Sequence, residues 1–165
     1  MLSKRSFFKT MGLALGLALT LGFTSQGQAQ ANRNVAQYNL AAGIGLKGWD
    51  PVAVFSEGGG RAQAGSSQIT LEHSGVRYQF ASERNRDLFR LDPEKYEPTY
   101  GGWCAYAMAS GSKVDIQPQL FTINGSRAHY FVSARAKQNF DRDIQSYETR
   151  ADDNWKQISG EEPRR

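Results

Sequence analysis

The chain has 165 residues, a length that suits one small domain with short appendages. Three of its 20 basic residues and none of its 16 acidic ones lie in residues 1–31, which leaves 17 basic and 16 acidic residues in the remainder. A nearly neutral body excludes the broad basic surface that nucleic-acid binding needs, and the single cysteine, Cys104, excludes an internal disulfide.

Residues 1–31 have the three parts of a secretory signal peptide. Basic residues at the start precede an apolar run over residues 11–24, and small residues follow it. The run is shorter than the about 20 residues that span a bilayer as a helix. We therefore expect cleavage near Ala29 or Ala31, a periplasmic or secreted protein, and no stable membrane span after cleavage. An uncleaved anchor is the alternative.

The stretch from Ser3 to Lys9 resembles a twin-arginine export motif in which Lys4 takes the place of the first arginine. Twin-arginine export carries folded proteins, whereas the general secretory route carries unfolded chains. The sequence leaves both routes open.

After the signal peptide we expect an extended lead-in over residues 32–43, a domain over residues 44–158, and a frayed charged tail over residues 159–165. Residues 68–73 and 76–80 alternate between apolar and polar types around a Ser-Gly turn, which predicts a β-hairpin. Ser82 can cap a helix that runs to about Leu91. Asp92 and Pro93 end that helix and open a short turn.

The second half of the domain begins with a small-residue segment, Gly101 to Ser110, which we predict as a helix ended by Gly111. Strands are expected over residues 120–123 and 129–132, joined by a turn at Asn124 and Gly125 whose loop continues to Ala128.

Ser133 is expected to begin the longest helix, in which apolar residues recur every three or four positions. This apolar stripe consists of Ala136, Phe140, Ile144, Tyr147, Ala151 and Trp155, and the solvent face of Arg142, Asp143, Glu148 and Arg150. We detect no internal repeat. The fold class is α+β: a small single domain with two short β-hairpins, a central pair of short helices and a long C-terminal amphipathic helix.

Several ordered motifs extend across the domain: Trp49–Phe55, Tyr78–Ser82, Phe89 with Asp92–Tyr96, Tyr100–Ala105 and Ala151–Trp155. In these motifs the chain resembles the YHS-domain family, and more narrowly its exported bacterial branch. It departs from that branch at Val54, where the branch has tyrosine, and at Phe121, where it has tryptophan.

The resemblance implies a module that the wider family uses in heavy-metal transport and sensing. Those members carry three cysteines, and thiolates suit ions such as Cu(I) and Zn(II). By position the cysteines fall on Ala53, Ala81 and Asn85, none of which can supply a thiolate. The resemblance therefore implies the family's fold without its thiolate site.

One group of residues is a candidate ligand-binding site. Glycines allow close approach of a backbone, and aromatic rings supply apolar surface with a polar handle. Asp50 either contributes to this site or caps the segment that follows it, and the glycine-aromatic segment either lines a pocket or packs against the core. The candidates are Asp50, Tyr100, Gly101, Gly102, Trp103 and Cys104.

Cys104 with His73 and His129 is a weaker candidate metal site for copper, zinc or iron, because the three lack a short ligand spacing. A buried, apolar role for Cys104 is the alternative. No short Cys-His spacing indicates a catalytic pair, and we assign no catalytic residue.

Three functional hypotheses follow from the sequence. The first is a non-catalytic binding or accessory module without a cofactor, whose partner is a small ligand or a periplasmic protein. The second is a metal-handling protein (copper, zinc or iron) that uses Cys104 with non-thiolate ligands. The third is a thiol-dependent enzyme, which would need an exposed Cys104 of low pKa.

Overall fold

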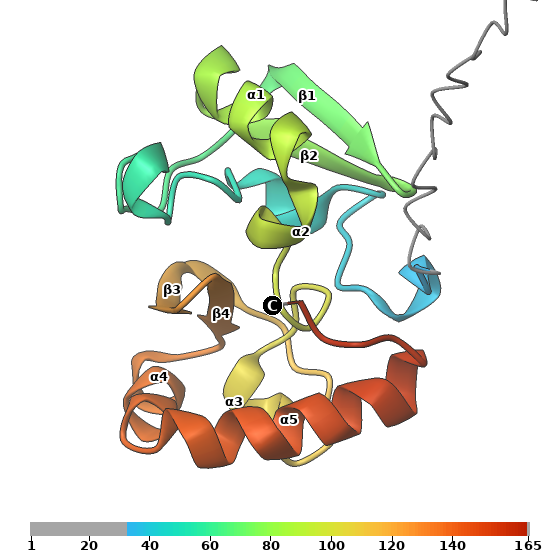
Figure 1. Cartoon of the computed structure of the whole chain (residues 1–165), viewed down its shortest axis with the longest axis vertical. Coiled ribbons are helices and arrows are strands. Elements are labelled where there is room, and N and C mark those ends of the chain that lie inside the picture. The colour runs from blue at the N-terminus through green and yellow to red at the C-terminus, as the bar shows by residue number, and fades with distance from the viewer. Residues whose placement is uncertain (1–32, 165) are drawn as a thin grey trace, which may run out of the picture. The chain divides into compact units, whose positions relative to one another are not determined.

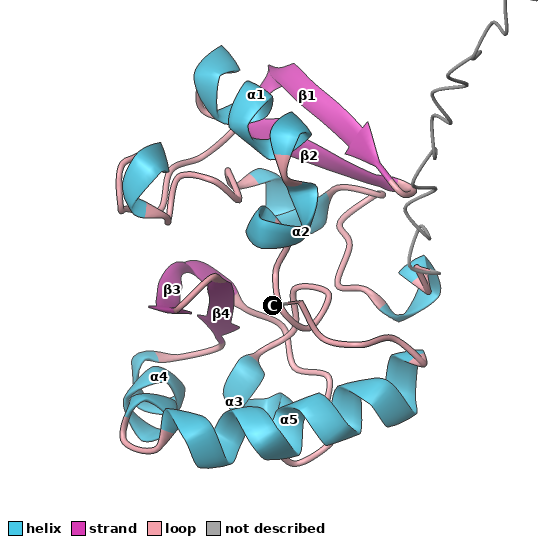
Figure 2. Cartoon of the chain, viewed as in Figure 1, coloured by secondary structure: helices cyan, strands magenta, loops and turns pink. Residues whose placement is uncertain are grey.

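Two antiparallel β-hairpins organise the part of the chain that the structure, a computed structural model, describes, residues 33–164 (Figures 1 and 2). Strand β1 (Ser66–His73) pairs with β2 (Val76–Phe80), and β3 (Gln117–Asn124) pairs with β4 (Arg127–Phe131). Each hairpin forms its own two-stranded sheet. The predicted signal peptide lies outside the described residues.

Five α-helices complete the predicted α+β domain. They are α1 (Glu83–Leu91), α2 (Pro93–Tyr96), α3 (Ala105–Met108), α4 (Ala134–Asp141) and α5 (Ile144–Ser159). Short 3-10 turns occupy Val35–Gln37, Gly45–Gly48 and Ser56–Gly58. None of the helices within residues 33–164 is long and apolar enough to cross a membrane.

All the α-helices except α3 begin where a side chain accepts a hydrogen bond from a free backbone N–H group. Ser82 Oγ accepts from the N–H of Asn85 at 3.1 Å, and Ser133 Oγ accepts from the N–H of Ala136 at 3.2 Å. Both predicted serine caps are thus confirmed.

Two of the predicted boundaries are wrong for local reasons. Gly101 and Gly102 have φ angles of 58° and 88°, a left-handed conformation that a right-handed helix cannot contain, so the helix starts only at Ala105. The second hairpin is tighter than expected, because Asn124 pairs with Arg127 and the turn consists of two residues.

The predicted single long helix is in fact two helices. After α4 ends at Asp141, Asp143 has a non-helical φ of −152°, and its carboxylate accepts from the N–H of Ser146 at 3.2 Å, so Asp143 caps α5. The apolar stripe is still buried at Ala151 and Trp155. Glu148, expected on the solvent face, is instead buried against the second hairpin.

The two ends of the described chain are also more ordered than expected. The lead-in contains a 3-10 turn and the buried ring of Tyr38. The charged tail is not frayed, because Glu161 and Arg164 are buried and pair with groups of the domain. Ion pairing of buried charges, rather than tail composition, decides this outcome.

The domain contains an internal repeat that sequence inspection missed. The second hairpin repeats the first at an offset of 51 positions, since β1 and β3 start at 66 and 117 and β2 and β4 start at 76 and 127. Even the irregularity in strand pairing recurs, between positions 66 and 70 and between 117 and 121. The helix caps Ser82 and Ser133 stand at the same offset.

The segment before each hairpin is also repeated, at an offset of 54. The N–H of Trp49 donates to the carbonyl of Leu46 at 3.0 Å, and that of Trp103 to Tyr100 at 3.1 Å. The next N–H, of Asp50 or Cys104, in each case donates to the segment that enters the following hairpin. We call residues 46–97 the first repeat and residues 100–148 the second repeat.

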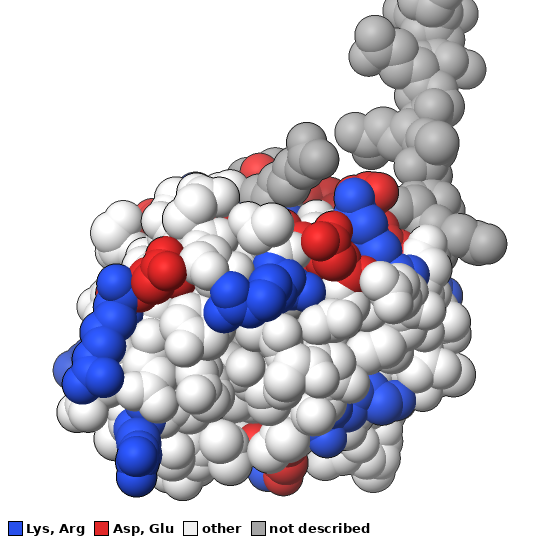
Figure 3. Space-filling model, turned by 90° about the horizontal axis from the view of Figure 1, so that it is seen from below, with Lys and Arg blue, Asp and Glu red and all other residues white. Residues whose placement is uncertain are grey.

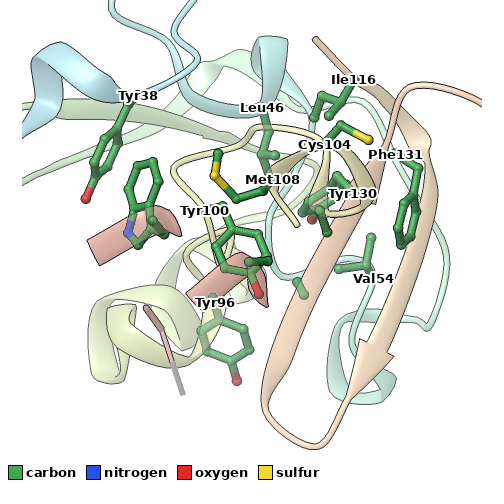
Figure 4. Close-up of a cluster of buried hydrophobic side chains, with 14 of the residues drawn as sticks. Tyr38, Leu46, Val54, Tyr96, Tyr100, Cys104, Met108, Ile116, Tyr130 and Phe131 are labelled. Carbon is green, nitrogen blue, oxygen red and sulfur yellow. The ribbon is translucent and has the colours of Figure 1, made fainter. Parts of the chain in front are cut away.

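The core lies between the hairpins and helices and is rich in aromatic rings. Figure 4 shows Tyr100, Cys104, Met108, Ile116 and Tyr130 among the buried side chains of this cluster. On the face that Figure 3 presents, basic side chains form separate groups with acidic or uncharged atoms between them. That face therefore carries no continuous basic surface.

Gly101 offers a test of this packing. A Cβ there would lie 2.8 Å from the Trp155 ring and 3.0 Å from the Tyr38 ring, whereas a Cβ on Gly125 would meet no atom within 4 Å. Both glycines have positive φ, so alanine at either should cost about 1–2 kcal/mol for the backbone. We expect Gly101→Ala to cost about 1–3 kcal/mol more in urea unfolding, from overpacking. Equal losses would contradict the structure.

Candidate functional site

Asp50 is a buried carboxylate with four hydrogen-bond donors, and 1% of the residue is exposed. Its Oδ1 accepts from the N–H groups of Val52 (2.8 Å) and Ala53 (3.2 Å). Its Oδ2 accepts from the N–H of Ala81 (2.8 Å) and from Nδ2 of Asn85 (2.7 Å). Asp50 therefore caps the segment that follows it, which is one of the two roles expected from the sequence. Its other oxygen connects this segment to the end of β2 and the first turn of α1.

The polar groups of the segment from Tyr100 to Trp103 form hydrogen bonds with other parts of the domain. The Tyr100 hydroxyl donates to Oδ1 of Asp152 at 2.8 Å, and burial raises the pKa of Tyr100. Nε1 of Trp103 donates to the carbonyl of Gln37 at 2.6 Å. The Gly102 carbonyl accepts from the Asn39 amide at 3.0 Å. These contacts match the packing alternative for this segment.

Cys104 is fully buried in the core, with 0% of the residue exposed (Figure 4). Its backbone bridges to Tyr130 of β4, and its N–H donates to the carbonyl of Val114 at 3.0 Å. A thiol that acts as a nucleophile has to be accessible to its substrate. The structure contradicts the exposure that the thiol-enzyme hypothesis requires.

The three candidate metal ligands do not meet as one group. Nε2 of His129 lies 2.6 Å from Oε1 of Glu148, while Nε2 of His73 lies 3.3 Å from the hydroxyl of Ser74. Within residues 33–164, one group of three side chains of metal-ligating type comes together. It consists of His73, Glu94 and Glu97, whose ligand atoms lie within 4.8 Å of one another.

That group already holds a cation of the chain itself. The guanidinium of Arg33 pairs with Glu94 and, at 2.6 Å, with Glu97. Because this guanidinium pairs with both carboxylates and occupies the space beside them, a metal ion would have to displace it. We therefore treat these residues as an ion-pair cluster.

Glu97 is the centre of the first of two buried clusters that the sequence did not reveal, and 1% of it is exposed. Its Oε1 accepts from the Tyr78 hydroxyl at 3.1 Å. Its Oε2 accepts from Arg33 at 2.6 Å and from Nε of Arg164 at 2.9 Å. Burial raises the pKa of Tyr78 well above its usual value, so this hydroxyl stays protonated and donates.

Glu148 is the centre of the second cluster. It accepts from Nε2 of His129 at 2.6 Å and from the Asn124 amide at 3.0 Å, and Arg127 lies 3.6 Å away. Although burial opposes ionisation, the hydrogen bond from His129 lowers the pKa of Glu148. Burial lowers the pKa of His129, so the imidazole is neutral near pH 7 and its Nε2–H donates to the carboxylate.

The two clusters occupy equivalent places in the two repeats. Glu97 and Glu148 stand 51 positions apart, and so do their partners Tyr78 and His129. Each carboxylate follows a tyrosine, and this Tyr-Glu pair at the repeat offset is the sequence signal that could have revealed the clusters.

Comparisons of the chain with models of known protein families, with curated proteins and with solved structures find no match. Its function is therefore inferred from the geometry of the described residues.

Asp50→Asn tests the importance of the four-donor carboxylate. An amide has only one oxygen, so its NH₂ group would face donors of Ala81 and Asn85. We expect a loss of about 2–4 kcal/mol in the free energy of unfolding. Asp153→Asn, at an exposed position of α5, should change stability by less than about 0.5 kcal/mol. A small effect at Asp50 would refute the role given to it.

The neutral state of His129 predicts a pH dependence. Because its pKa is lower in the folded protein, the unfolded chain binds more protons, and stability falls as pH drops through the unfolded value of about 6.5. The lowered pKa of Glu148 adds a further loss as pH falls below about 4.5.

His129→Gln keeps an N–H donor at this position but does not titrate. We expect its unfolding free energy to fall less than that of the parent between pH 7.5 and 5.5, measured by urea unfolding at each pH. His73 is present in both proteins, so its titration cancels in the comparison. Parallel pH profiles for the two proteins would exclude His129 as the group responsible.

Proposed function

We propose that this chain is an exported YHS-type domain that works as a non-catalytic binding or accessory module in the periplasm or outside the cell. The observation that carries the proposal is the surroundings of Asp50. The three positions that match the family's cysteines are Ala53, Ala81 and Asn85, and each donates a hydrogen bond to this one carboxylate. Residues far apart in the sequence thus gather where a shared metal site would require them.

The hydrogen-bonded carboxylate of Asp50, which lies beside the positions where the wider family has thiolates, supports a stabilising role for these residues. All four donors of Asp50 come from the chain, and the carboxylate is buried. A metal ion coordinated here would need ligands that can be deprotonated or that carry free lone pairs, and three backbone N–H groups and an amide NH₂ offer neither.

The burial of the single thiol and of the two carboxylates at the centres of the clusters supports a non-catalytic role. Cys104 is buried, and the carboxylates of Glu97 and Glu148 are held by fixed donors. Nucleophilic catalysis needs a reactive group with a base beside it and access for the substrate. Binding of a small ligand or a periplasmic protein needs neither.

The metal-handling alternative would place ligands beside Cys104. Within residues 33–164, the group of metal-ligating side chains that comes together does not include Cys104. The alternative stays a prediction, and metal content tests it.

Cysteines restored at the three matching positions test the family assignment. The variant Ala53→Cys, Ala81→Cys, Asn85→Cys should bind one equivalent of Zn(II) at least about 100-fold more tightly than the parent, because three thiolates with Asp50 can complete a four-ligand shell. Affinity is measured by competition with a chromophoric chelator. Ala53→Cys alone is the control. A folded triple variant that binds no more tightly than this control would contradict the proposed convergence.

Metal content after native export tests the accessory role. The parent and Cys104→Ala, each exported with the natural N-terminal segment, should both contain far less than one equivalent of copper, zinc or iron. Near-stoichiometric metal that disappears in Cys104→Ala would overturn the proposal in favour of metal handling.

A further inference from the structure

The C-terminal tail, residues 160–164, places an arginine side chain inside the domain. In Figure 1 the red segment that follows α5 turns back among the other elements of the described region. Arg164 is 4% exposed. Its Nε donates to Glu97 at 2.9 Å, and its Nη2 donates to Glu161 at 3.2 Å and to the Tyr38 hydroxyl. The centre of the guanidinium lies 5.9 Å from the centroid of the Tyr38 ring.

The guanidinium is therefore recognised in three ways at once. The Glu97 carboxylate supplies charge, the Tyr38 hydroxyl supplies an acceptor, and the ring of Tyr38 supplies a face for a delocalised cation. The Tyr78 hydroxyl fixes the other oxygen of Glu97. We call Tyr38, Tyr78 and Glu97 the arginine socket.

The internal repeat shows that this socket lacks a guanidinium of its own. In the second repeat, Glu148 has Arg127 beside it, from strand β4 of the same repeat. The position equivalent to Arg127 in the first repeat is Val76, which is buried and apolar. The guanidinium groups on Glu97 come instead from Arg33 and Arg164, both outside the first repeat.

The tail is held mainly by its own side chains. Gly160 follows α5 with a φ of 75° and turns the chain out of the helix. The Glu161 carboxylate then accepts from the Tyr38 hydroxyl at 2.8 Å and from the N–H of Asn34, and the N–H of Glu161 donates to Ser159 Oγ at 3.0 Å. This segment belongs to no helix or strand, so its release breaks these side-chain contacts while the backbone hydrogen bonds of both repeats stay intact.

We infer that the arginine socket is a recognition site for an arginine side chain of a partner protein, which Arg164 of the tail occupies until the partner displaces it. This inference rests on the proposed binding role and names its partner chemistry. Glu97 is buried and has two guanidinium partners, so release of the tail without replacement leaves Arg33 as its single cation and is unfavourable. Exchange for another arginine restores the second partner.

Competition from the tail also sets the affinity that a partner needs in order to bind. A tethered group competes at an effective concentration in the millimolar range, so an external arginine segment binds the complete chain more weakly than a chain without the tail. The partner has to compensate with contacts outside the socket.

The experiment uses a fluorescent peptide with the sequence of residues 159–165 as the probe, and three exported forms of the protein. These are the complete chain, the complete chain with Arg164→Ala, and a chain that ends at Ser159. We expect the last two to bind the peptide at least about 10-fold more tightly than the complete chain, measured by fluorescence polarisation. Glu97→Gln in the shortened chain should reduce binding at least about 10-fold.

A matched peptide in which citrulline replaces the arginine at position 164 keeps the shape of the side chain but removes its charge. It should bind at least about 10-fold more weakly than the arginine peptide. If folded Arg164→Ala protein binds both peptides equally, or gains no affinity over the complete chain, the inference is overturned. A dimer of the complete chain that disappears with Arg164→Ala would support the site and identify the partner as a second copy.

The outcome is separable from that of the proposed function. Stoichiometric metal lost in Cys104→Ala would replace the proposed binding role with metal handling while leaving the peptide measurements intact. Failure of peptide binding would reject the socket without affecting the metal measurements.

Discussion

The buried carboxylate of Asp50 is the interaction on which the packing of the first repeat depends. Its four donors come from the loop after it, from the end of β2 and from the start of α1. A buried charge is tolerable only when hydrogen bonds replace its lost hydration, and these four donors do so. One side chain therefore holds the loop after Asp50, the β1–β2 hairpin and α1 in fixed relative positions. This explains how a two-stranded hairpin keeps a defined position in the domain.

In the second repeat the equivalent segment, hairpin and helix pack together without a buried charge at the position of Asp50. Cys104 stands where the first repeat has Asp50, and Ala136 stands where it has Asn85. The acceptor and its donor are thus both replaced by small apolar groups, so neither is left unsatisfied. This pairing gives a physical reason for a lone, fully buried cysteine: it fills a core position that a carboxylate fills in the other repeat.

The sequence predicts the local features of this fold and misses those that depend on distant partners. The serine caps and the hairpins follow from turn residues and alternation, which act over a few positions. The break at Asp143 is hidden, because the apolar period continues through it. Glu148 is expected to be exposed on charge alone, and only the fold shows His129 beside it. The repeat is hidden because its two halves share structure at few identical residues.

The same limit applies most strongly to the arginine socket, and it has a functional consequence. Glu97 lies 64 positions from Arg33 and 67 from Arg164, so no spacing rule connects them. Arg33 precedes the first repeat and Arg164 follows α5, whereas Glu97 and Tyr78 belong to the packed first repeat. Segments outside helices and strands open at lower free energy than packed elements. The identity of the guanidinium on Glu97 can therefore change while both repeats stay folded, as a recognition site requires.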